Sequence, residues 1–100
     1  MKIFLDDIRK PPDESWTLCK WPNEVIDLLL TGKVTHLSLD HDLGNDDFGT
    51  GNDVVIWLEE QVYFNRLRPP IITVHSANPV GRKKMEQGIK NIYWYYGGAS

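Results

Sequence analysis

Short apolar runs alternate with longer amphipathic segments along this chain. The short runs are rich in β-branched, aromatic and leucine residues, which is typical of β-strands. The longer segments place apolar residues three and four positions apart, which predicts helices packed on a core. The predicted strands cover residues 2–6, 16–20, 34–40 and 71–75, and the predicted helices cover residues 22–31, 52–65 and 79–90.

The helix starts follow from residues that favour the first turn. Pro22 suits the first helical position, and Asn52 and Asn78 are good N-terminal caps. The aromatic segment 92–96 either extends the last helix or forms another strand, and the pattern leaves both open. We expect residues 97–100 to form a frayed tail.

Strands that alternate with helices predict a single α/β domain over residues 1–100, of the flavodoxin-like or receiver-like type. We expect a mostly parallel sheet of order 2-1-3-4 with helices on its faces. Only about seven residues separate the first two strands, where a parallel crossover usually needs a dozen. A proline-rich extended arm over residues 9–15 gains roughly 3.1 Å per residue and is long enough to replace the crossover helix.

Composition limits the possible functions. The chain has 100 residues and a formal charge of −3, which does not favour an extended nucleic-acid surface. An RNA end or another small phosphate-containing ligand remains compatible. The single cysteine, Cys19, excludes an internal disulfide and a cysteine-built zinc site, and we interpret it as a packing residue. No segment reads as a signal peptide or membrane span, so we expect a cytoplasmic protein with no membrane contact.

Carboxylates follow two strands that are expected to be neighbours. Asp6 and Asp7 come directly after the first strand, and Asp40 and Asp42 follow the third. In the predicted order, the carboxyl ends of these strands mark the topological switch point where ligands bind. Buried charge without a partner is costly, and hard divalent cations take oxygen ligands. We therefore predict a Mg²⁺ or Mn²⁺ site with Asp6, Asp7 and Asp40 as ligands.

Two histidines also end strands at this edge. Imidazole serves as general acid, general base or metal ligand. We assign His41 and His75, with Asp42, to catalysis, and interpret His36 as structural because it lies deeper in its strand.

The turn before the last helix supplies candidate phosphate ligands. Free N–H groups at a helix N-terminus attract anions. Ser76 and Asn78 lie in this turn, and Arg82 follows one helical turn later, although an exposed surface arginine is an equal alternative for it. We add Arg9, on the arm, to the phosphate-binding set. Asp46 and Asp47 are interpreted as solvated loop acids.

Three segments together resemble a known family. Phe-Leu-Asp-Asp-Ile-Arg at residues 4–9, Ser-Leu-Asp-His-Asp-Leu-Gly at 38–44 and Val-His-Ser-Ala-Asn-Pro at 74–79 resemble the response-regulator receiver superfamily. More closely, they resemble its small stand-alone branch, the cyclic-phosphate processing receiver domain, over about residues 1–90. The resemblance implies that Asp6 and Asp7 hold magnesium. It also implies that Asp40 accepts a phosphoryl group contacted by Ser76.

The chain departs from ordinary receivers in ways that bear on activity. It lacks the first helix and the lysine at the end of a fifth strand, and it adds His41 and His75. We therefore predict a metal-dependent phosphoesterase, a hydrolase that opens a cyclic phosphate such as a nucleoside or RNA 2′,3′-cyclic phosphate, with RNA repair as the implied setting. The alternative is a stand-alone receiver that binds or accepts a phosphoryl group at Asp40 and signals through a protein partner. The aromatic C-terminal segment is a possible surface for such a partner.

Overall fold

The computed structural model of the chain describes residues 1–43 and 49–98. The loop acids Asp46 and Asp47 lie outside the described residues, as do residues 99–100. The strands are β1 (Lys2–Leu5), β2 (Trp16–Cys19), β3 (His36–Leu39) and β4 (Ile71–Val74), and the helices are α1 (Pro22–Leu29), α2 (Gly51–Tyr63) and α3 (Pro79–Tyr93), followed by a π-helical turn, η2 (Trp94–Gly98).

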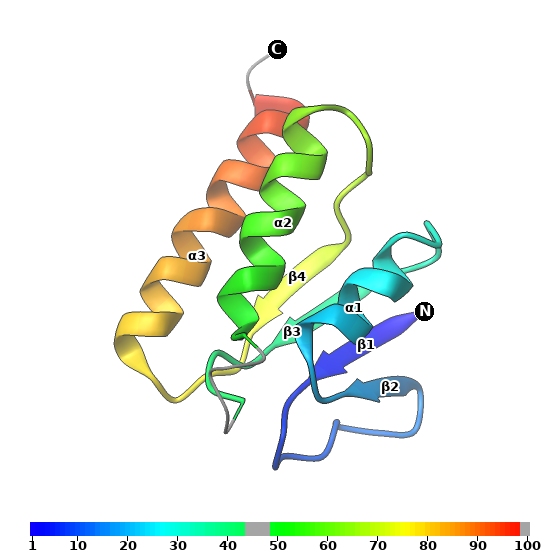
Figure 1. The fold of residues 1–100 in the computed structure, drawn as a ribbon, viewed down its shortest axis with the longest axis vertical. Coiled ribbons are helices and arrows are strands. Elements are labelled where there is room, and N and C mark those ends of the chain that lie inside the picture. Colours follow the sequence, from blue (N-terminus) through cyan, green and yellow to red (C-terminus); the bar gives the residue numbers. More distant parts are fainter. Residues whose placement is uncertain (44–48, 99–100) are drawn as a thin grey trace.

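The four strands form one parallel sheet in the order β2-β1-β3-β4, as predicted (Figure 1). The first crossover is the expected extended arm without a helix. The strands are aligned so that their carboxyl ends are level. The backbone N–H of Asp40 donates to the carbonyl of Leu5, and that of His75 donates to the carbonyl of Leu39. The residues that directly follow β1, β3 and β4, namely Asp6, Asp40 and His75, therefore lie at the same edge of the sheet.

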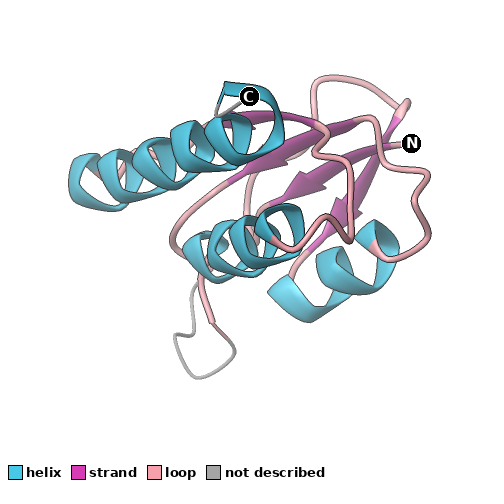
Figure 2. Ribbon diagram, turned by 90° about the horizontal axis from the view of Figure 1, so that it is seen from above, coloured by secondary structure: helices cyan, strands magenta, loops and turns pink. Residues whose placement is uncertain are grey.

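The hydrophobic core lies on one face of the sheet. Alternate strand residues, such as Leu5 and Leu39, are fully buried in a cluster that also contains Val25 of α1, Leu58 of α2 and Met85 of α3. Helices α1, α2 and α3 all contribute to this one cluster. The helices that we expected on the sheet faces therefore lie on one face only (Figure 2). The physical reason is that the first crossover has no helix to place on the other.

The opposite face carries the alternate residues of the strands. Phe4 of β1 pairs in register with Ser38 of β3, and both side chains are buried, at 6% and 7% exposure. Trp16 of β2 packs edge-on against Phe4, with ring centroids 6.2 Å apart. An aromatic and hydroxyl layer thus takes the place of a helix on this side.

The aromatic C-terminal segment is helical, which resolves the choice that the sequence left open. Tyr93, at the end of α3, accepts a hydrogen bond from the backbone N–H of Ile72 at 3.1 Å and donates one to the carbonyl of Pro70. It therefore satisfies backbone groups along the outer edge of β4, where a further strand would pair. Gly97 and Gly98 belong to η2, where a frayed tail was expected.

The helix starts differ slightly from the predictions. Pro22 occupies the first turn of α1, and the side chain of Asn78 caps α3, both as expected. The N-terminal cap of α2 is Thr50 and not Asn52. The reason is local: Asp53 accepts a hydrogen bond from the N–H of Thr50 at 2.7 Å, which closes a capping box two residues earlier than expected.

Candidate functional site

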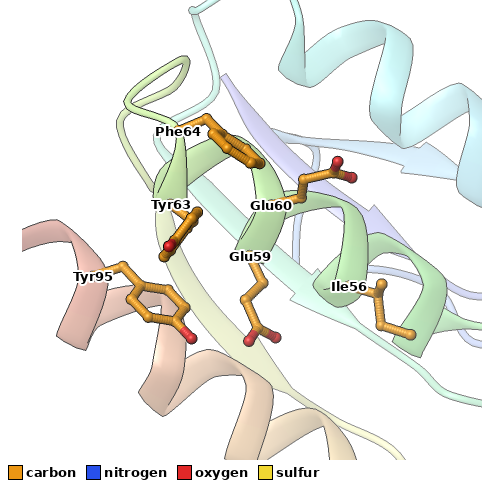
Figure 3. Close-up of a pocket in the computed structure, with 6 residues that line it drawn as sticks. All are labelled: Ile56, Glu59, Glu60, Tyr63, Phe64 and Tyr95. Atoms are coloured by element: carbon orange, nitrogen blue, oxygen red, sulfur yellow. The ribbon is translucent and has the colours of Figure 1, made fainter.

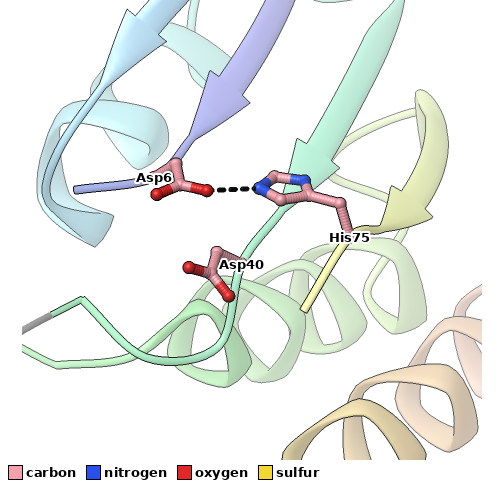
Figure 4. Close-up of side chains that lie close together, drawn as sticks. All are labelled: Asp6, Asp40 and His75. Carbon is pink, nitrogen blue, oxygen red and sulfur yellow. Dashed lines mark hydrogen bonds and ion pairs between the residues drawn. The ribbon is translucent and has the colours of Figure 1, made fainter. Parts of the chain in front are cut away.

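Asp6, Asp40 and His75 come together at the carboxyl edge of the sheet (Figure 4). One ligand-type atom of each lies within 4.8 Å of the other two. They follow β1, β3 and β4, so the level strand ends bring them together. A pocket of about 330 Å³ opens here, lined by Asp6, Asp7, Ile8, Arg9, Asp40, Asp42 and Ala77.

Asp6 is held rigidly by the start of the arm. One carboxylate oxygen, Oδ1, accepts hydrogen bonds from the backbone N–H groups of Ile8 and Arg9, both at 2.9 Å. The side chain is only 1% exposed. Burial raises the pKa of Asp6, but these hydrogen bonds and the contact with His75 outweigh it, so the pKa lies below its ordinary value. Asp6 is therefore a fixed carboxylate whose second oxygen, Oδ2, faces the group.

The His75 ring is held through both of its nitrogens and one of its faces. Its Nε2 lies 3.0 Å from Oδ2 of Asp6, and its Nδ1 lies 2.7 Å from Oγ of Ser38. The ring stacks on Phe4, with centroids 4.2 Å apart and planes within 5°. The guanidinium of Arg9 donates to the carbonyl of His75 at 2.6 Å. These contacts leave the imidazole a single orientation, with Nε2 directed at the carboxylates.

The pKa of Asp40 is shifted in the direction opposite to that of Asp6. Burial and the negative charge of Asp6 raise the pKa of Asp40, and hydrogen bonds from the N–H of His41 and from Ser76 offset only part of this. The His41 N–H lies 2.8 Å from Oδ1. Two nearby carboxylates with pKa values pushed apart, in a pocket, are typical of functional sites.

His41 and Asp42 form a separate pair beside the first turn of α3. Nδ1 of His41 lies 2.9 Å from Oδ1 of Asp42, and the amide of Asn78 donates to the same carboxylate at 3.3 Å. The His41 ring packs directly on Gly81, where a Cβ atom would overlap it. Asp42 lines the acidic pocket and His41 does not.

Of the remaining predicted site residues, some line the acidic pocket and others do not. Asp7 and Arg9 line the pocket, although Asp7 is not in the close group. Ser76 is buried, and its Oγ accepts the N–H of Asn78. The amide oxygen of Asn78 accepts the N–H groups of Val80 and Gly81, so the cap itself uses donors that we expected to face an anion.

Arg82 does not line the acidic pocket. Its Nε lies 3.7 Å from Oε1 of Glu86, and it faces a groove beside β4. A phosphate-binding role for Arg82 stays a prediction. Cys19 is buried as expected, and burial, with the charge of Glu24, raises the pKa of its thiol to about 11. The thiol is therefore protonated at neutral pH.

Sequence reasoning missed Ser38 and Phe4. The available signal was their spacing: each lies two residues before a site carboxylate, on the face opposite to the core leucines. A strand serine on an aromatic face needs a polar partner, and His75 provides it.

A larger hollow lies at the other end of α2, about 540 Å³ in volume (Figure 3). Tyr63 packs edge-on against both Phe64 and Tyr95, with centroids 5.0 and 5.1 Å apart. Ile56, Glu59 and Glu60 complete the lining. This aromatic groove, defined by these six residues, contains no residue of the acidic pocket.

The chain matches a known protein family over most of its length. Residues 1–91 match the family described as the cyclic-phosphate processing receiver domain. No curated protein and no solved structure matches the chain. Among the described residues, no helix is both long and apolar enough to cross a membrane.

Proposed function

The chain belongs to the cyclic-phosphate processing receiver family, and from this we propose that it is a metal-dependent phosphoesterase that opens a cyclic phosphodiester. Nucleoside or RNA 2′,3′-cyclic phosphates are the proposed substrates. The supporting observation is the meeting of Asp6, Asp40 and His75 within 4.8 Å, beside a pocket of about 330 Å³. That volume is within the range of small-molecule sites.

The carboxylates fit a divalent cation. Receiver domains typically bind Mg²⁺ at an acidic pocket, and here Asp6 and Asp40 supply oxygen donors, with Asp7 beside them. Each of the two close carboxylates already has one oxygen fixed by backbone N–H groups. In the proposed reaction, Mg²⁺ or Mn²⁺ would polarise the phosphoryl oxygens when bound.

The histidines distinguish this site from an acid-only receiver pocket. Opening a cyclic phosphate needs a proton taken from water and another given to the leaving ribose oxygen, whereas signalling needs neither. In this proposal His41, held through Nδ1 by Asp42, transfers a proton through its other ring nitrogen. The Nε2 of His75 points into the group and either transfers a proton or binds the metal; one nitrogen cannot do both at once.

Phosphate binding is proposed for residues around the pocket. Arg9 lines it and already reaches His75. Ser76 interacts with Asp40, and Asn78 contacts Asp42. With Arg82, these side chains are the set whose replacement should weaken substrate binding.

The test is hydrolysis by purified protein. Nucleoside 2′,3′- and 3′,5′-cyclic phosphates and RNA with a 2′,3′-cyclic phosphate end are incubated with Mg²⁺ or Mn²⁺, and the products are separated. We expect metal-dependent opening of the 2′,3′ ring that Asp40→Asn abolishes and His36→Ala, an imidazole outside the pocket, preserves. An absence of hydrolysis on all these substrates contradicts the proposal.

Phosphoryl sensing is the second candidate. Asp40 occupies the position of the receiver phosphoacceptor, and the raised pKa and Ser76 contact agree with a phosphoryl site. The exposed aromatic groove offers a surface for the protein partner that a signalling domain needs. Uptake of a phosphoryl group at Asp40 from a small donor, detected by mass, without any hydrolysis, would favour this function.

A further inference from the structure

The His75 ring is held in the way that a metal-ligating histidine is usually held. Both ring nitrogens are used: Nε2 faces Asp6, and Nδ1 contacts the hydroxyl of Ser38 at 2.7 Å. A histidine that binds a metal through one nitrogen usually gives its other N–H to an oxygen, which fixes the tautomer and the ring plane. Ser38 is in the position to accept the hydrogen bond from that N–H, and Phe4 fixes the ring plane by stacking.

The separation of the two donor atoms fits a shared ion. Ligand atoms about 2.1 Å from one ion lie about 3.0 Å apart at a right angle and about 3.4 Å apart at a tetrahedral angle. Nε2 of His75 and Oδ2 of Asp6 are 3.0 Å apart. The other oxygen of Asp6 is held by Ile8 and Arg9, so Oδ2 stays directed at this point.

The Ser38 hydroxyl suits both states of the site. Without a metal, a neutral His75 ring donates a hydrogen bond from Nε2–H to Asp6, because a carboxylate only accepts, and Nδ1 then accepts a hydrogen bond from Ser38. With a metal on Nε2, the proton must move to Nδ1, which then donates to Ser38. A hydroxyl donates or accepts by rotation about one bond, whereas a carboxylate would only accept. Ser38 is therefore a positioning residue that supports the metal-binding tautomer without moving any backbone.

We infer that Nε2 of His75 is a metal ligand, positioned by Ser38, and that the site consequently binds a first-row transition-metal ion in preference to Mg²⁺. Imidazole favours transition ions, whereas Mg²⁺ favours carboxylates and water. The inference rests on the proposed function only in placing a metal between Asp6 and Asp40. Proton transfer then falls to the pair of His41 and Asp42.

Metal titration of the purified chain tests this without any substrate. Mn²⁺ is titrated and followed by electron paramagnetic resonance, and Mg²⁺ affinity is obtained by competition. Because many all-oxygen sites also prefer Mn²⁺, the decisive quantity is the change in the ratio of Mn²⁺ to Mg²⁺ affinity between variants. We expect His75→Gln to lower Mn²⁺ affinity about tenfold to a hundredfold and to leave Mg²⁺ affinity nearly unchanged.

Ser38→Ala gives an independent variant that keeps the imidazole. We expect about a tenfold loss of Mn²⁺ affinity, with little change for Mg²⁺. His36→Gln is the matched control, since His36 lies on the same sheet face but its ring interacts with Thr35 and Trp16 and does not line the acidic pocket. Bound Mn²⁺ should also show coupling to an imidazole nitrogen in pulsed spectra, present in the wild type and His36→Gln and lost in His75→Gln.

The outcomes separate this inference from the proposed function. An unchanged affinity ratio in His75→Gln, or a wild-type spectrum without nitrogen coupling, overturns the inference while leaving a carboxylate-bound cation. Nitrogen-coupled Mn²⁺ without hydrolysis of any cyclic phosphate supports the inference and contradicts the proposed function. A wild-type chain that binds neither ion contradicts both.

Discussion

Nε2 of His75 lies 3.0 Å from Oδ2 of Asp6, although 69 positions separate the two residues in the sequence. They follow β4 and β1, which are not neighbours, because β3 lies between them. The His75 side chain therefore crosses the end of β3, passing Ser38, to reach Asp6. This contact joins the two outer parts of the site and places Asp40, which follows β3, beside both.

Asp40→Asn should stabilise the metal-free protein at pH 7. Burial and the charge of Asp6 raise the pKa of Asp40, so its ionised form is less favourable in the fold than in the unfolded chain. A carboxyl group whose pKa is raised by folding stabilises the folded state at pH values below its ordinary pKa of about 3.9. This contribution to the free energy of unfolding is lost as the pH rises through the pKa of the folded state. The variant should melt higher than the wild type at pH 7 with chelator, and the difference should disappear near pH 3.

The same variant should lose the response to metal. At a concentration about one hundredfold above Kd, a bound ion adds about 2.7 kcal/mol, or about 10–20 °C in a domain of this size. We expect this rise in melting temperature with Mn²⁺ for the wild type and none for Asp40→Asn. An equal rise in both proteins would place the ion elsewhere.

Asp6→Ala should destabilise the metal-free protein in a pH-dependent way. It removes the carboxylate that accepts the N–H groups of Ile8 and Arg9, and hydrogen bonds to a charged group contribute about 1.5–3 kcal/mol. Folding lowers the pKa of Asp6, so the ionised carboxylate adds to the free energy of unfolding at pH values above its ordinary pKa of about 3.9. This contribution is lost as the pH falls through the pKa of the folded state. Urea unfolding should show a full difference at pH 7 that narrows only below about pH 4.

His75→Ala should lower the turnover of a nucleoside 2′,3′-cyclic phosphate by at least about tenfold, because it removes the inferred metal ligand, and His41→Ala, which removes a proposed proton-transfer group, should lower it by less. His75 lies in the close group, whereas the His41 ring pairs with Asp42, which lines the pocket, and does not line the pocket itself. Circular dichroism should show that both variants fold, and His36→Ala should keep wild-type turnover. Equal turnover of His75→Ala and the wild type would remove His75 from the reaction.

Gly51→Ala should disturb the site through the backbone. A Cβ atom at Gly51 would overlap the carbonyl oxygen of Asp40, so α2 could not approach the end of β3. We expect a loss of about 2 kcal/mol, seen as a melting temperature about 8–16 °C lower, together with weaker metal binding. Gly97→Ala is the control, since a Cβ atom at Gly97 would meet no other atom within 4 Å; a similar loss there would point to a general effect.

The local pattern was sufficient for much of the fold. Each predicted strand and helix is present, with boundaries shifted by a few residues, because apolar spacing and caps such as Asn78 act over a few positions. The proline-rich arm was predictable because its length excludes a helix. The end of the chain was not, since an aromatic segment suits a strand or a helix equally until Tyr93 meets the edge of β4.

For the candidate site, the sequence by itself determined which polar residues end the strands. Parallel strands of known order must bring Asp6 and Asp40 to one edge, so their proximity needed no coordinates. Only the tertiary structure decided the rest. It paired His75 with Asp6 and Ser38, packed the His41 ring against Gly81, and placed Arg82 at a groove beside β4 and not at the acidic pocket. Strand order fixes where a side chain begins, whereas its direction depends on packing among residues far apart in the chain.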